Sequence, residues 1–191
     1  MKLVFKSLLP HFVAILTFVI FSSLFFSPVF QGYSLKQSDV KQYRGMSKEI
    51  SDHFVLKDEN PLWTNSMFSG MPAYQILVTG KNNSFSMVNK LFKLGLPMPV
   101  ALLFSVMLGF YIFSLCLRVN PWLGMAGAVA CGFCTINLLY LGAGHITKVN
   151  AISYMAPALG GLILSFRGKV LLGATVFALF LGLNLMANHP Q

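Results

Sequence analysis

Side chains able to do acid–base chemistry are confined to one short stretch of this sequence. All five acidic residues lie between positions 39 and 59, and residues 60–191 contain none. Any carboxylate base, or any metal site built on carboxylates, must therefore come from this stretch. Asp39 lies soon after an apolar segment and has two open roles, a helix N-cap or a reactive carboxylate. The other four typically solvate a surface helix and loop: Glu49, Asp52, Asp58 and Glu59.

Cationic and amide side chains at the ends of apolar segments form a second group of candidates. His145 and Lys148 lie in a glycine-containing connection, where they can supply positive charge and hydrogen-bond donors. Asn184 and Asn188 lie one helical turn apart and are followed by His189. An interhelical hydrogen bond is the alternative role for Asn184. Carboxylate and cationic groups on one side of a membrane suit transfer chemistry on a phosphate-bearing lipid.

Other motifs in the sequence favour packing over chemistry. Cys131 and Cys134 have the spacing of a redox pair, but they lie within an apolar segment, where small apolar filler is the favoured interpretation. Gly124, Ala128 and Gly132 form a small-residue stripe that is typical of close helix packing. The sequence shows no phosphate-binding glycine loop, Ser/His/Asp pattern or His/Cys zinc pattern.

The composition indicates which class of chain must position these residues. Hydrophobic residues make up 55% of the 191 residues and charged residues 10%, against roughly 25% charged residues in soluble domains. This excludes a disordered chain, a coiled coil and a secreted disulfide scaffold. The net charge of +9 comes from basic residues between apolar runs, which favours membrane-helix ends over a nucleic-acid surface.

The sequence predicts an all-α polytopic membrane protein with about five transmembrane helices and a large first extracytoplasmic loop. Each span needs about 20 mainly apolar residues. A retained N-terminal anchor is favoured over a cleaved signal peptide, because no small-residue cleavage site follows the first apolar run. The predicted spans are residues 11–30, 98–117, 121–141, 150–166 and 170–188, with the outer loop at 31–97.

Basic residues in the short connections predict the orientation of these spans. Because Lys and Arg mark the cytoplasmic side, the N-terminus is predicted to be cytoplasmic and the first loop extracytoplasmic. The connection around residue 145 then lies outside with the loop. The basic residues that favour this orientation are Lys2, Lys6, Arg118, Arg167 and Lys169.

The long loop is predicted to contain its own elements. Apolar positions at helical spacing predict an amphipathic helix over about 38–54, with Asp39 and Gln42 as a capping pair at its start. A second helix is predicted over 85–94, with Lys90 and Lys93 on its polar face. The aromatic and Pro/Gly-rich stretch 61–74 between them is predicted to be an ordered loop.

Five segments of the sequence carry a family resemblance: QSDVKQYRGM (37–46), LWTNSMFSGMPAYQ (62–75), GAGHITK (142–148), YMAP (154–157) and ANHPQ (187–191). They resemble segments of YfhO-like bacterial membrane proteins. That family belongs with the GT-C type glycosyltransferases, polytopic enzymes that move sugar from a polyprenyl-phosphate carrier to an extracytoplasmic acceptor. The members are considerably longer, so the chain resembles their N-terminal part, and this part is expected to be inactive alone.

The resemblance implies roles for the candidate residues. Asp39 matches the first-loop acidic residue of GT-C enzymes, as acceptor-activating base or as the carboxylate of a metal-assisted site. His145, Lys148, Asn188 and His189 become candidates for binding the carrier phosphate or the sugar. No cofactor is implied beyond an optional divalent metal.

The resemblance also implies the protein's surroundings. The implied partners are a lipid-linked sugar donor, a cell-envelope acceptor and membrane lipids, without nucleic acid, in the bacterial cytoplasmic (inner) membrane. Two alternatives stay open. One is a non-catalytic membrane scaffold or transporter fragment, and the other is a membrane thiol oxidoreductase using Cys131 and Cys134.

Overall fold

The computed structural model describes residues 2–77 and 83–189 of the chain. It divides into two compact units, which we call the helical unit (residues 1–35 and 85–191) and the loop unit (residues 36–84). The described residues are mainly α-helical, which confirms the predicted all-α class.

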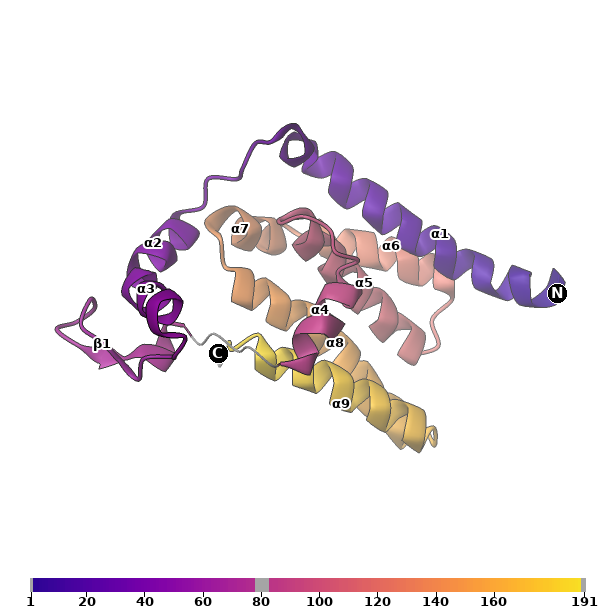
Figure 1. Ribbon diagram of the computed structural model, residues 1–191. Coiled ribbons are helices and arrows are strands. Elements are labelled where there is room, and N and C mark those ends of the chain that lie inside the picture. The colour runs from indigo at the N-terminus through magenta and orange to yellow at the C-terminus, as the bar shows by residue number, and fades with distance from the viewer. Residues whose placement is uncertain (1, 78–82, 190–191) are drawn as a thin grey trace. The chain divides into compact units, whose positions relative to one another are not determined.

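The helical unit is built around α5 (Val100–Cys116), which lies among the other helices of this unit in Figure 1. Most residues of α5 are buried. This helix packs against α1, α6 and α8, and α8 packs along α9. Its nearly continuous apolar sequence suits a helix that is covered on all sides. The other elements of this unit are α1 (Lys2–Phe25), η1 (Ser27–Gln31), α4 (Ser84–Phe92), α6 (Pro121–Gly132), α7 (Thr135–Ala143), α8 (Ile146–Phe166) and α9 (Val170–Met186).

Small residues allow these helices to approach closely. A Cβ added to Gly109 of α5 would lie 2.0 Å from the backbone oxygen of Ser153 in α8. A Cβ on Gly132 would lie 2.4 Å from Cγ of Met107, and Gly124 and Ala128 are also buried. The predicted packing role of the stripe formed by Gly124, Ala128 and Gly132 is therefore confirmed.

The structure contains fewer clear membrane spans than the five predicted. Within the described residues, α1 and α8 are long and apolar enough to cross a membrane, and α6 with α7 would make a third span. Helices α5 and α9 are apolar but shorter. The candidate spans therefore number two to three.

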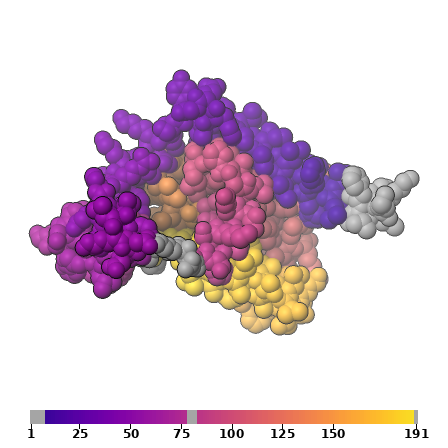
Figure 2. Space-filling view, viewed as in Figure 1, coloured from indigo at the N-terminus to yellow at the C-terminus, as the bar shows by residue number. Residues whose placement is uncertain are grey.

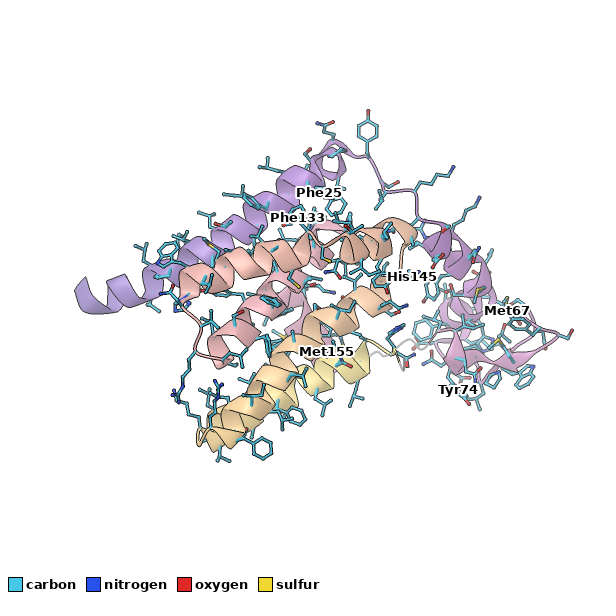
Figure 3. All side chains as sticks on the ribbon, turned by 180° about the vertical axis from the view of Figure 1, so that it is seen from behind. Phe25, Met67, Tyr74, Phe133, His145 and Met155 are labelled. Carbon is cyan, nitrogen blue, oxygen red and sulfur yellow. The ribbon has the colours of Figure 1, made fainter. Side chains whose placement is uncertain are left out.

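The predicted single helix over 121–141 is wrong, because α6 and α7 are separate helices bent by 48°. Residues 133–134 lie between them, and Cys134 is the N-cap of α7. The Asn137 side-chain nitrogen donates to the backbone oxygen of Cys131 at 2.8 Å, which satisfies a carbonyl at the end of α6. Figure 3 shows Phe25 beside Phe133 at this break, with ring centroids 5.3 Å apart.

The loop unit contains two short helices and a small hairpin. The predicted helix over 38–54 is divided at Ser47 into α2 (Ser38–Met46) and α3 (Lys48–Lys57). The predicted capping role of Asp39 is wrong, because Gln37 occupies the N-cap and Asp39 lies in the first turn. The stretch 61–74 is ordered as predicted, with β1 (Trp63–Thr64) antiparallel to β2 (Met71–Pro72), followed by η2 (Ala73–Gln75).

Candidate functional site

A pocket of about 530 Å³ lies among α7, α8 and α9 of the helical unit. Its polar side chains come from the start of α8, the end of α9 and the end of α7. Its apolar walls extend along α8 and α9, from which Figure 3 labels Met155. The lining residues are Tyr140, Lys148, Ala151, Ile152, Met155, Ala158, Leu159, Phe177, Leu181, Asn184 and His189.

The pocket has a polar end and an apolar end because α8 and α9 are antiparallel. Lys148 lies near the N-terminus of α8, and Asn184 near the C-terminus of α9 is hydrogen-bonded to the neighbouring Ala151. Leu159 lies eleven residues beyond Lys148 along α8, a rise of about 16 Å. That is about half of the roughly 30 Å hydrocarbon thickness of a bilayer. The pocket thus suits an elongated ligand with an anionic head.

The ring of Tyr140 contacts two of the candidate side chains, Lys148 and His145. The Lys148 ammonium lies over the Tyr140 ring, 4.8 Å from its centroid, which is a favourable cation–π distance. The ring of His145 meets the same tyrosine edge-on, with centroids 5.6 Å apart. Gly144, with φ of 96°, ends α7 in the left-handed conformation and turns the chain so that His145 becomes the N-cap of α8.

The asparagines near the end of α9 have different roles. Asn184 donates its side-chain nitrogen to the backbone oxygen of Ala151 at 2.9 Å, so the interhelical hydrogen bond is confirmed. Asn188 adopts φ of 50° just after α9 and is exposed. It lines a smaller pocket of about 140 Å³ together with Asn184, Leu185 and His189. His189 lines both pockets.

The structure therefore brings some of the sequence-derived candidates together. Lys148 and His189 line one pocket, Asn188 lines the smaller one, and His145 contacts Tyr140 of the main pocket. Asp39 belongs to the loop unit, where its Oδ1 accepts from the Ser38 hydroxyl at 3.2 Å.

Tyr140 was not among the residues predicted from the sequence. The available signal was an aromatic residue eight positions before Lys148, at the end of the preceding apolar segment.

Lys93 is a buried cation whose predicted place on a polar helix face is wrong. Its residue is only 9% exposed, and its ammonium donates to Oδ1 of Asn150 at 2.7 Å. Burial lowers the pKa of Lys93 to about 8. One turn earlier, Asn89 accepts a 2.5 Å hydrogen bond from the Tyr154 hydroxyl. Two polar pairs thus attach the α4 region to α8, and Figure 2 shows α4 lying on the surface beside α9.

Glu49 organises the loop unit instead of only solvating it. Its carboxylate accepts 2.5 Å hydrogen bonds from the hydroxyls of Thr64 and Ser66. The backbone nitrogens of Asn65 and Ser66 donate to it at 3.1 and 2.9 Å. These bonds lower the pKa of Glu49 to about 2, with the Ser66 hydroxyl contributing most. The carboxylate therefore holds the 61–74 segment against α3.

The described cysteines form no disulfide bond with one another. All three cysteines are free thiols, with Cys131 partly buried and Cys134 exposed. Over residues 2–77 and 83–189, no group of three or more His, Cys, Asp or Glu side chains is placed to hold a metal ion.

Comparisons with protein-family models, curated proteins and solved structures found no match to this chain.

Proposed function

We propose that this chain belongs to an integral-membrane glycosyltransferase of the GT-C type, which transfers sugar from a polyprenyl-phosphate carrier to an extracytoplasmic cell-envelope acceptor. The observation that carries the proposal is the pocket among α7, α8 and α9. It combines a long apolar wall with Lys148 and His189 at its polar end. A polyprenyl phosphate has the same division, an apolar chain attached to an anionic head.

The apolar walls accommodate the isoprenoid part of the carrier. Ile152, Met155 and Leu159 recur on one face of α8, opposite Phe177 and Leu181 of α9. A pocket with apolar walls and few polar groups binds by burial and orients its ligand through those polar groups. The phosphate then lies at the Lys148 end.

The polar end supports departure of the carrier phosphate. Breaking the bond between the anomeric carbon and the phosphate oxygen leaves additional negative charge on that phosphate. In this proposal Lys148, whose ammonium lies over the Tyr140 ring, and the imidazole of His189 stabilise this charge. The helical unit contains no Asp or Glu that would repel the phosphate.

The residue that activates the acceptor hydroxyl is proposed from the resemblance to YfhO-like proteins. Asp39 acts as the base in this proposal. It accepts the proton of the acceptor hydroxyl while the hydroxyl oxygen forms the new bond to the anomeric carbon. A divalent metal is an optional addition to this carboxylate.

The proposal includes the five-span arrangement with a cytoplasmic N-terminus. Helices α5 and α9 each contain 17 residues, the lower end of the range that can span a bilayer. Their predominantly apolar sequences support this role. Arg118, Arg167 and Lys169 then lie on the cytoplasmic side, and the Lys148 end of the pocket lies outside.

The test is transfer of labelled sugar from a polyprenyl-phosphate donor in membranes that contain the native, full-length protein. Lys148→Gln should lower the transfer rate by roughly 100- to 1,000-fold, as expected for loss of one charge-stabilising group. Exposed Lys90 provides the matched control, since Lys90→Gln should leave the rate unchanged. Asp39→Asn should abolish transfer without affecting membrane insertion. Asp52→Asn should leave transfer unchanged. Wild-type transfer by Lys148→Gln or by Asp39→Asn would contradict the corresponding role.

A further inference from the structure

Two connections far apart in the sequence meet at the end of the helical unit opposite the Lys148 end of the pocket. One is the turn between α5 and α6 (residues 117–120), and the other is the turn between α8 and α9 (residues 167–169). The Arg167 guanidinium joins them by donating to the backbone oxygen of Leu117 at 3.1 Å. This bond places Arg167 beside the residue that precedes Arg118.

The two turns together present exposed positive charge without a compensating acid. Arg118, Arg167 and Lys169 are all exposed. The whole helical unit contains no Asp or Glu, so no carboxylate of this unit neutralises these cations. A guanidinium has five N–H donors, and the contact with Leu117 fixes its orientation while using one side of the group. Such a group matches the geometry of a phosphate.

Exposed apolar side chains flank the cations. Phe166, which is 85% exposed, immediately precedes the α8–α9 turn, and Leu171, two residues after that turn, is 84% exposed. Trp122, at the start of α6, is 47% exposed. Cations bordered by a tryptophan and bare apolar side chains match the boundary between lipid headgroups and acyl chains.

We propose that the two turns form a binding site for the phosphate of an anionic phospholipid, such as phosphatidylglycerol or cardiolipin. Arg118, Arg167 and Lys169 bind the headgroup. Phe166 and Leu171 contact the part of the acyl chains next to the headgroup. This site is separate from the α7–α9 pocket and does not depend on sugar transfer.

Quenching of Trp122 fluorescence by brominated lipids tests the site. The full chain carries Trp63→Phe, so that Trp122 is its only tryptophan, and is reconstituted in bilayers. The bilayers contain phosphatidylcholine with a small fraction of either brominated phosphatidylglycerol or brominated phosphatidylcholine. Attraction to anionic lipid is about 1 kcal/mol per cation, which is about fivefold. Brominated phosphatidylglycerol should therefore occupy the site at least fivefold more favourably than the brominated phosphatidylcholine.

Charge removal gives the decisive comparison. The triple variant R118Q/R167Q/K169Q should lose the preference, while Lys90→Gln should retain it. Lys169→Gln alone should reduce the preference, and it leaves the Arg167–Leu117 bond intact if the triple variant fails to fold. Equal quenching of the parent protein by the two brominated lipids would overturn the proposal. So would a preference that survives in a folded triple variant.

Discussion

Burial of the Lys93 ammonium makes the stability of the helical unit depend on pH in a defined direction. The pKa of this group is lowered from 10.5 to about 8, because the folded state desolvates its charge. Below pH 8 the amine is protonated in both states, and its burial costs at most about 3 kcal/mol. Between pH 8 and 10.5 the folded state releases the proton while the unfolded state keeps it. Unfolding free energy should therefore rise with pH across this window.

Lys93→Met tests this reasoning because it removes the charge and keeps a long apolar stem. The variant loses the hydrogen bond to Asn150, which costs about 1–3 kcal/mol when the amide is left without its partner. Near pH 7 the gain from removing the buried charge and the loss of the hydrogen bond to Asn150 offset each other. The dependence of the unfolding free energy on pH is therefore more informative than its value at one pH. The rise between pH 8 and 10.5 should be absent in Lys93→Met, and it should be present in the exposed control Lys90→Met.

The assay is denaturant unfolding in mixed micelles, followed by circular dichroism at several pH values. The double variant Lys93→Met/Asn150→Leu removes both polar partners and should be more stable than Lys93→Met alone at pH 7. A Lys93→Met profile parallel to that of the wild type would refute the claim that the buried ammonium is destabilising.

Two further predictions concern packing and the loop unit. Gly109→Ala should destabilise the contact between α5 and α8 by about 1–3 kcal/mol, because its Cβ would meet the Ser153 backbone. Gly142→Ala has open space and should stabilise α7 by about 0.5–1 kcal/mol, so equal thermal stability of the two variants would contradict the packing model. Glu49→Gln should speed proteolysis within residues 61–74, whereas Asp52→Asn should not. Because the pKa of Glu49 is lowered, wild-type protection should be complete above about pH 4.5 and be lost as pH falls toward 2. Protection from proteolysis that is unchanged at pH 2 would contradict the role of the Glu49 carboxylate in holding residues 61–74.

Elements with strong local signals could be predicted from the sequence. The small-residue stripe on α6 and the helix at 84–92 are examples, because periodicity and breaker residues define them. The break between α6 and α7 could not be predicted in this way. Gly132 lies beside the break but belongs to the packing stripe of α6, and the bond from Asn137 to the Cys131 carbonyl appears only once the chain has bent.

In the candidate site too, some residues could be predicted from the local sequence and others depend on tertiary contacts. Side-chain chemistry and topology selected Lys148 and His189, which line one pocket. The part played by Tyr140 depends on how α7 turns into α8. Lys93 looked like a surface residue because its partner Asn150 is 57 residues away.

Charge is distributed unevenly between the two units, and this has a functional consequence. Every acidic residue belongs to the loop unit, so the helical unit is free of carboxylates along its full sequence. No acidic side chain of the helical unit repels an anionic lipid headgroup, and its basic side chains attract one. Both proposed lipid sites, the α7–α9 pocket and the paired turns, use this property.

The most direct test of the central claim is photo-crosslinking of the native protein with a diazirine-bearing polyprenyl phosphate, mapped by mass spectrometry. Labels should fall on the pocket walls at Ile152, Met155 and Leu181, and unlabelled polyprenyl phosphate should displace them better than the uncharged polyprenol. Lys148→Gln should weaken the labelling. Labels spread over exposed α1 residues such as Phe12, or equal displacement by phosphate and alcohol, would contradict a carrier-phosphate pocket.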